Sequence, residues 1–269
     1  MIAAALLADF NGHDLGNALL RWAHVVAGVL WIGHLYFFNF VNAELAKTYD
    51  ADSKRKVIPE LMPRALYWFR MGAAWTWVTG LLLAAMLYWF GPYFTTDGSK
   101  PEASQWGAAL AVIVVGFVVY DVIAKALQTQ PMVALWIWYA VAIGFAWALQ
   151  KVELFSASER AAYIHTGALL GTAMAANVWM RIWPAQKRII TAIKNGQAPN
   201  PADPAVAGVR SKHNTFMSVP LLMLMLSVHG SAGAGVSFGE PWMWVAGLCL
   251  VGFLATQWLY ATASKVKGF

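Results

Sequence analysis

The sequence predicts an all-α, polytopic membrane helix bundle with about seven transmembrane helices. Of the 269 residues, 59% are hydrophobic and only 12% are charged, whereas soluble domains are about 45–50% apolar and about 25% charged. Apolar stretches of about 20 residues, long enough to cross a bilayer as helices, recur along the whole chain. The 15 Trp, 9 Tyr and 14 Phe also suit the two interfaces of a bilayer.

Seven segments have the length and composition of a membrane span. The predicted spans are residues 17–42, 68–90, 105–124, 131–149, 160–183, 214–230 and 241–262. The sixth is the weakest, because Pro220 should kink it and its apolar run is short. Two longer connections, 43–67 and 184–213, separate these spans, and the proline-rich stretch at 197–204 predicts an irregular excursion. No Gly/Ser linker or long repeat appears, so we expect one integral membrane domain over residues 1–269.

The distribution of lysine and arginine predicts the orientation. Most basic residues lie in two connections and the C-terminal tail: Lys47, Lys54, Arg55, Lys56 and Arg64; Lys187, Arg188, Lys194, Arg210 and Lys212; Lys265 and Lys267. The connections on the other side carry only Lys100, Lys151 and Arg160. The positive-inside rule therefore predicts an outside N-terminus and a cytoplasmic C-terminus, in a multi-pass protein of the bacterial inner membrane. This distribution explains the net charge of +6 without a nucleic acid partner.

The first predicted span carries two histidines at membrane depth. Residues 21–42 read RWAHVVAGVLWIGHLYFFNFVN, with His24 and His34 inside an apolar helix. An ionisable side chain at that depth is costly, so each is a functional-site hypothesis, and imidazole is a common ligand of metals and haem. The two lie ten residues apart, about 15 Å along a helix and about 80° around it, so one flat ligand cannot bind both.

Five of the six histidines fall within or beside predicted spans, in two groups by depth. The outer group is His24, His165 and His229, the inner group is His34 and His213, and the sixth, His13, is expected to be solvated outside. We predict these five as axial ligands of one or two b haems. Copper is the second choice, because the histidines sit among Trp, Phe and Gly rather than carboxylates or thiols. The alternative is that each histidine hydrogen-bonds neighbouring helices.

Few other polar residues occur at depth. Arg21 begins the first span and is expected either to anchor it at the interface or to hold a haem propionate or an anionic substrate. Asp121 and Lys125 are spaced i,i+4 and predict a mutually neutralising pair near the inner end of the third span. Asn39, Asn42, Asn177 and Gln257 are candidates for hydrogen bonds between helices or, alternatively, for holding a polar ligand.

Other motifs narrow the chemistry. Gly167 and Gly171 form a GxxxG, which indicates close helix packing or, alternatively, the approach of a flat macrocycle. Cys249 is the single cysteine, which excludes a disulfide framework, a zinc knuckle and a CxxCH haem attachment, and indicates a small buried residue. We find no Ser-His-Asp arrangement, phosphate loop or HExxH, and no catalytic residue can be assigned.

Three stretches together resemble the membrane domain of bacterial membrane-bound urate oxidases, the cytochrome c-linked urate hydroxylases. They are residues 21–42, HTGALLGTAMAANVWMRIWPAQKRII (165–190) and SKHNTFMSVPLLMLMLSVHG (211–230). The first is the least specific, since it also resembles the small haem-binding membrane proteins of the protoporphyrinogen oxidase type. The positions that match within these motifs are His24, His34, His165, Asn177, His213, Asn214 and His229.

The resemblance implies a dehydrogenase of purine catabolism that oxidises urate to 5-hydroxyisourate and passes electrons to cytochrome c. Typical members carry a C-terminal cytochrome c domain with a CxxCH motif, which these 269 residues lack. We therefore expect a separate c-type cytochrome or a respiratory-complex subunit as electron acceptor, or a divergent relative with another substrate.

Two other functional classes stay open. The chain is alternatively a non-catalytic, haem-binding electron-transfer or anchoring subunit of a respiratory complex. A transporter of a small anion or metal is disfavoured, because no repeated halves and no matched pair of broken helices appear. The true substrate, the number of haems and whether the chain forms an oligomer are not determined by the sequence.

Overall fold

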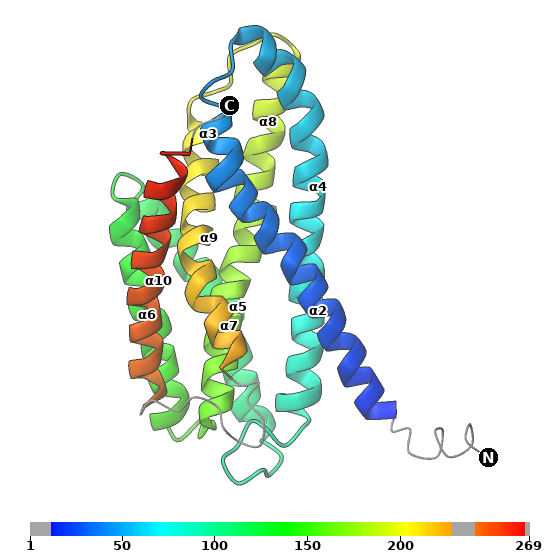
Figure 1. Cartoon of the computed structure of the whole chain (residues 1–269). Coiled ribbons are helices and arrows are strands. Elements are labelled where there is room, and N and C mark those ends of the chain that lie inside the picture. Colours follow the sequence, from blue (N-terminus) through cyan, green and yellow to red (C-terminus); the bar gives the residue numbers. More distant parts are fainter. Residues whose placement is uncertain (1–11, 228–239, 267–269) are drawn as a thin grey trace, which may run out of the picture.

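The computed structural model describes residues 12–227 and 240–266, and its regular elements are helices. They run side by side as an elongated bundle, so the predicted all-α membrane fold is confirmed (Figure 1). In chain order the elements are α2 (Gly12–Tyr36), η1 (Phe37–Asn42), α3 (Ala43–Leu45), α4 (Ala51–Ala84), η2 (Ala85–Trp89), α5 (Ala103–Ala126), α6 (Pro131–Lys151), α7 (Glu159–Asn177), η3 (Val178–Ile182), α8 (Trp183–Lys194), α9 (Ala202–Leu226) and α10 (Pro241–Ala263). The three η elements are π-helical segments that continue α2, α4 and α7.

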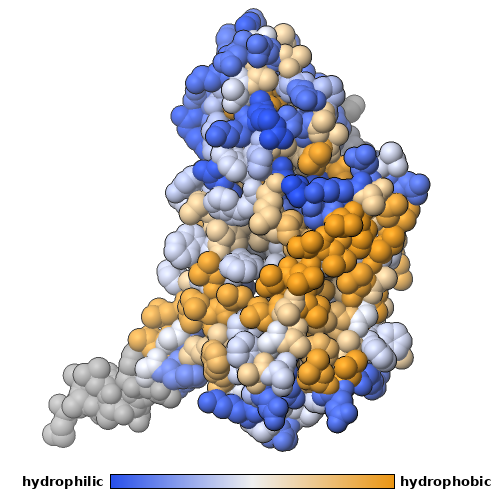
Figure 2. Space-filling view, turned by 180° about the vertical axis from the view of Figure 1, so that it is seen from behind, coloured by the Kyte–Doolittle hydropathy of each residue, from blue (hydrophilic) through white to orange (hydrophobic). Residues whose placement is uncertain are grey.

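Five helical stretches are long and apolar enough to cross a membrane, so the chain is a multi-pass membrane protein. They are Gly12–Leu45, Ala51–Trp89, Ala103–Ala126, Pro131–Lys151 and Pro241–Ala263. The fifth predicted span, 160–183, matches α7 and η3 together. The sixth, 214–230, overlaps α9 as far as Leu226 and ends outside the described residues. Buried polar residues lower the apolar content of both α7 and α9. Figure 2 shows an apolar band across the middle of the molecule, with hydrophilic surface at both ends.

The two long connections are largely helical, which corrects the prediction of loops at 43–67 and 184–213. Helix α4 begins at Ala51, and α8 and α9 leave only residues 195–201 outside a helix. The carboxylate of Asp50 caps α4 by accepting the backbone N–H of Ser53 at 2.7 Å, which lowers the pKa of Asp50. Pro59 and Pro63 lie inside α4 without ending it. Sequence patterns misplace these boundaries, because polar helices that extend beyond a bilayer lose the apolar signal.

The helical extensions gather at one end of the bundle together with the C-terminal end of α10, while α2 begins near the opposite end (Figure 1). Within them Arg188 binds Asp203 with its Nε at 2.9 Å from Oδ1, which ties α8 to α9. This ion pair lowers the pKa of Asp203. The two basic connections therefore share one end of the molecule (Figure 1).

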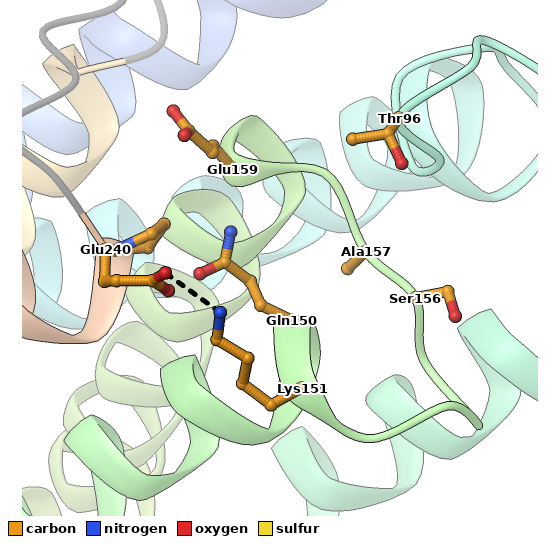
Figure 3. A pocket seen from close by; sticks show the side chains of 8 residues that line it. Thr96, Gln150, Lys151, Ser156, Ala157, Glu159 and Glu240 are labelled. Atoms are coloured by element: carbon orange, nitrogen blue, oxygen red, sulfur yellow. Dashed lines mark hydrogen bonds and ion pairs between the residues drawn. The ribbon is translucent and has the colours of Figure 1, made fainter.

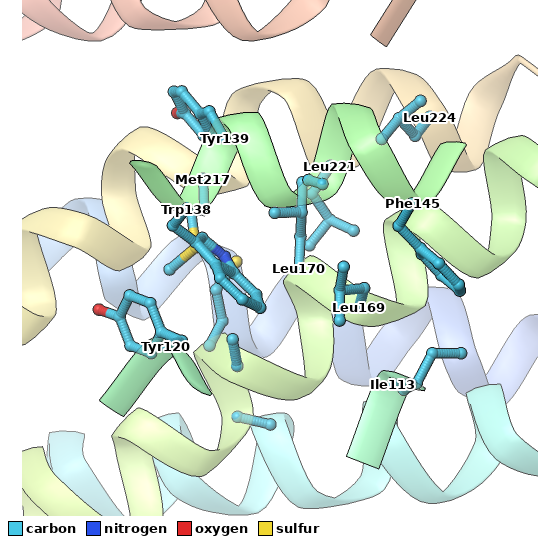
Figure 4. Packing of buried hydrophobic residues seen from close by; sticks show 14 of the residues in the cluster. Ile113, Tyr120, Trp138, Tyr139, Phe145, Leu169, Leu170, Met217, Leu221 and Leu224 are labelled. Carbon is cyan, nitrogen blue, oxygen red and sulfur yellow. The ribbon is translucent and has the colours of Figure 1, made fainter. Parts of the chain in front are cut away.

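The core lies between α5, α6, α7 and α9. Trp138 from α6 is fully buried and its ring lies 5.3 Å from that of Tyr120 on α5, measured between centroids. Figure 4 shows the two rings beside the leucines of α7 and α9. Because lipid tails are as apolar as these side chains, close packing and hydrogen bonds, more than burial alone, hold such helices together.

Helices α2 and α4 approach each other closely at Gly72. A Cβ built on Gly72 would lie 2.8 Å from the backbone nitrogen of Trp31 and 3.1 Å from the carbonyl oxygen of Ala27. Backbone atoms cannot move aside as a flexible side chain can, so the contact requires the absence of a side chain here.

Replacing Gly72 with alanine should therefore push α2 from α4 and lower the free energy of unfolding by about 1–3 kcal/mol. Thermal unfolding in detergent, followed by circular dichroism, measures the loss. Gly144→Ala is the matched control, because nothing lies within 4 Å of a Cβ at Gly144. Equal midpoints for the two variants would contradict the proposed contact.

Candidate functional site

A buried ionic cluster surrounds Asp121 near the end of α5. Its carboxylate accepts hydrogen bonds from Arg181 Nη2 at 2.6 Å and from Arg210 Nη2 at 2.8 Å, and Lys125 Nζ lies 2.8 Å away. Asp121 is 6% exposed and Arg210 is 4% exposed. The predicted Asp121–Lys125 pair is thus confirmed, but it belongs to a larger cluster in which three cations share one carboxylate.

Sequence reasoning missed two members of this cluster. Arg181 falls at the end of the fifth predicted span, and Arg210 was assigned to a solvated loop. Because α9 begins at Ala202, before the span predicted from residue 214, Arg210 lies inside a helix and is buried against α5. The sequence signal for a buried role of Arg210 is its position on a helix that continues into a predicted span.

A chain of buried hydrogen bonds leads from the ionic cluster to His213. Arg210 Nη1 lies 3.5 Å from Asn177 Oδ1, and Asn177 Nδ2 donates to the Tyr120 hydroxyl at 3.0 Å. The Tyr120 hydroxyl lies 2.8 Å from His213 Nδ1, and His213 Nε2 lies 2.8 Å from the Pro131 carbonyl oxygen. A carbonyl only accepts, so we assign the proton to Nε2 and the accepting lone pair to Nδ1. Both ring nitrogens of His213 are therefore hydrogen-bonded.

The polar residues of α7 and α9 also bind each other directly. Asn177 Nδ2 donates to Asn214 Oδ1 at 2.9 Å, and Asn214 Nδ2 donates to the Met174 carbonyl at 3.0 Å. The predicted interhelical role of Asn177 is confirmed. Asn39 behaves similarly, since it binds Ser211 and accepts from the Tyr260 hydroxyl, both at 2.8 Å.

His165 lies in an aromatic cluster at the other end of α7. Trp89 Nε1 donates to His165 Nε2 at 3.0 Å, and His165 Nδ1 lies 2.8 Å from the Ala161 carbonyl oxygen. Since the indole can only donate and the carbonyl can only accept, the imidazole is neutral with its proton on Nδ1. The rings of Tyr88 and Phe94 contact it edge-on at 5.6 and 5.2 Å between centroids. Both nitrogens of His165 are thus also used.

His24 on α2 has a different arrangement. Its Nδ1 lies 3.1 Å from Thr79 Oγ1, and that hydroxyl donates its own proton to the Trp75 carbonyl at 2.6 Å. His24 Nδ1 must then be the donor, which puts the lone pair on Nε2. The ring lies against Gly80, where a Cβ would come within 2.9 Å of His24 Cε1. This tautomer and second-sphere bond are those of a metal-binding histidine.

His34 and Arg21, two further predicted site residues, each form a hydrogen bond within their own helix, α2. His34 Nδ1 donates to the Leu30 carbonyl at 2.7 Å, which also leaves the lone pair on Nε2, and Arg21 Nε donates to Asn17 Oδ1 at 2.7 Å. His229 lies outside the described residues. Within residues 12–227 and 240–266, no three His, Cys, Asp or Glu side chains lie close enough to hold one metal ion.

The hydrogen bonds of His165 and His213 disfavour a haem iron at either ring. At His165 a metal would have to displace the Trp89 indole, and at His213 the Pro131 carbonyl or the Tyr120 hydroxyl. The GxxxG on α7 is filled by α9, since a Cβ on Gly167 would lie 2.8 Å from Met225 Cε and one on Gly171 3.9 Å from Leu221. This agrees with the helix-packing interpretation. His24 and His34 retain the ligand tautomer, and of these only His24 is oriented by another helix.

A cavity of about 580 Å³ opens between the ends of α6, α7 and α10. It is lined by Thr96, Gln150, Lys151, Ser156, Ala157, Glu159, Glu240 and Pro241 (Figure 3). Lys151 is the one basic residue among these described lining residues, and its Nζ is already paired with Glu240 Oε1 at 2.9 Å. An anionic substrate is therefore not favoured here.

The family comparison covers nearly the whole chain. A family model described as Urate oxidase N-terminal matches residues 11–57 and 48–268. No curated protein and no solved structure matches the chain.

Proposed function

Because the chain belongs to the urate oxidase N-terminal family, we propose that it is a membrane oxidoreductase that oxidises urate to 5-hydroxyisourate. In this reaction urate loses two electrons and two protons and adds one whole water molecule. The electrons go to a c-type cytochrome at the surface of a bacterial inner membrane. The family match over residues 11–268 is the observation that carries this proposal.

We propose that the chain holds a b haem for electron transfer and that His24 would be one of the residues that bind its iron. The tautomer that Thr79 imposes supports this choice, as does the lack of a side chain at Gly80 beside the ring. A b haem supplies one-electron redox chemistry at a potential set by its ligands and their hydrogen bonds. His34 is the candidate for a second site at another depth, while His165 and His213 act as hydrogen-bonding residues between helices.

The cluster around Asp121 supports the recognition of an anion. Lys125, Arg181 and Arg210 carry three positive charges against one carboxylate, and the Lys125 and Arg181 side chains are 60% and 31% exposed. Urate is an anion at neutral pH, and a surplus of positive charge at a partly exposed cluster raises the local concentration of anions. We therefore propose that urate first binds at the exposed side of this cluster, beside Lys125 and Arg181.

The test is anaerobic mixing of purified protein with urate and an oxidised, soluble c-type cytochrome. We expect a Soret band in the isolated protein, a reduced b-haem α-band after urate is added, and two cytochromes reduced per 5-hydroxyisourate formed. A protein without haem and without urate oxidation would contradict both proposals. A haem that cytochrome c oxidises but urate does not reduce would instead identify the non-catalytic electron-transfer subunit.

A further inference from the structure

Arg70 on α4 lies in a cage of aromatic rings. Its guanidinium carbon lies 3.9 Å from the ring centroid of Trp183 and 5.7 Å from those of Trp179 and Tyr67. The Trp179 indole is held there because its Nε1 donates to the Arg70 carbonyl at 3.1 Å. The cage thus joins α4 to η3 and α8.

The charge of Arg70 has no carboxylate partner among the described residues. Four other arginines each pair with an acidic side chain: Arg64 with Glu60, Arg181 and Arg210 with Asp121, and Arg188 with Asp203. The Nε of Arg70 is buried and has no hydrogen-bond partner in the same part of the chain. Aromatic faces attract a cation but accept no strong hydrogen bonds, so the cage leaves the Nε donor of Arg70 unsatisfied.

The cage lies where the bundle passes from apolar to polar surface. Trp179 and Trp183 flank Arg181, which binds the inner end of α5, so the cage stands at the height where that span ends. Tyr67, Trp68 and Trp179 are 45%, 52% and 40% exposed. Exposed Trp and Tyr at such a height occupy the headgroup region of a bilayer.

A second feature continues from the cage along the polar end of α4. An open cavity of about 480 Å³ is lined by Pro59, Glu60, Pro63, Arg64, Tyr67 and Trp68. Tyr67 belongs to both the cage and the cavity. A phospholipid whose phosphate meets Arg70 would find room there for the polar part of its headgroup, with its acyl chains along the apolar band.

We propose that Arg70 and its aromatic cage bind the phosphate of an anionic phospholipid. The guanidinium offers the charge and the donors that a phosphate requires, and the indoles and phenol shield the pair from water. This lipid site is independent of urate oxidation and of haem, since none of its residues belongs to the ionic cluster or contacts His24.

Native mass spectrometry of protein in detergent tests the site, with phosphatidylglycerol or phosphatidylcholine added as the probe. We expect the wild-type protein to retain one phosphatidylglycerol and to retain phosphatidylcholine less well. The Arg70→Gln variant should bind phosphatidylglycerol at least tenfold more weakly than the wild type and lose it. Arg70→Lys keeps the charge and should lose less affinity than Arg70→Gln. Lys56→Gln removes one exposed charge from the same helix, about 21 Å away, and should behave as wild type.

Wild-type protein alone also tests the site if Arg70→Gln does not fold. Phosphatidylglycerol should protect Arg70 from modification by phenylglyoxal, which reacts with guanidinium groups, while the exposed Arg55, which lines neither the cage nor the cavity, stays reactive. Equal lipid retention by wild type and Arg70→Gln, or equal loss in Lys56→Gln, would overturn the proposal. Displacement of the lipid by millimolar urate would reassign the cage to the substrate and overturn it too.

Discussion

Replacing Asp121 with alanine should cost about 3–5 kcal/mol and leave little folded protein. The carboxylate is the shared partner of Arg181 and Arg210, and Arg210 is only 4% exposed. Its removal leaves two guanidinium groups in the bundle without a counter-charge. Yield after size-exclusion chromatography in detergent and the midpoint of thermal unfolding measure the loss.

Two variants separate this charge effect from general damage. Lys125→Gln removes a partner that is 60% exposed and should cost less than about 1 kcal/mol, as surface ion pairs do. The double variant Asp121→Ala/Arg210→Met removes a buried charge of each sign and should recover part of the stability. If Asp121→Ala unfolds at the wild-type midpoint, the cluster does not stabilise the bundle.

Replacing His24 with leucine should abolish the Soret band at its site and, with it, the reduction of cytochrome c by urate. The reason is the tautomer: the Nδ1–H of His24 donates to Thr79 and so presents Nε2 as the ligand atom. Thr79→Val keeps the shape but removes that acceptor and should weaken haem retention by about 10–100-fold. Haem content by the pyridine haemochrome spectrum measures both.

The matched comparison is His213→Leu. This variant breaks the bonds to Tyr120 and Pro131 and should lower stability while leaving the Soret band of the folded fraction in place. A Soret band that persists in His24→Leu and disappears in His213→Leu would reverse the two roles.

The fold could be predicted because its determinants are local. Length and apolarity define a span on their own, and the structure has a helix at each of the seven predicted positions. The polar helices could not be predicted in the same way. The start of α4 depends on the cap at Asp50, and the start of α9 at Ala202 is supported by the contact between Arg188 and Asp203.

The site was only partly predictable, because partners decide what a histidine can do. His24, His165 and His213 look alike in the sequence as imidazoles in apolar surroundings. Only the positions of Trp89, Pro131 and Thr79 show which ring nitrogen of each histidine donates and which accepts. Each of these contacts joins residues more than 50 positions apart, beyond any local pattern.

The π-helical segments have a consequence for insertions and deletions in this chain. Each segment fits one more residue into its turns than an α-helix would, which advances the following helix by about 100° around its axis. Deleting one residue from η3 (Val178–Ile182) would restore α-helical winding and rotate α8, with Trp183, relative to α7. The same deletion between Asn195 and Pro201, outside the helices, only shortens a connection. Insertions and deletions in homologous chains should therefore accumulate between Asn195 and Pro201 and be excluded at the three π-helical segments.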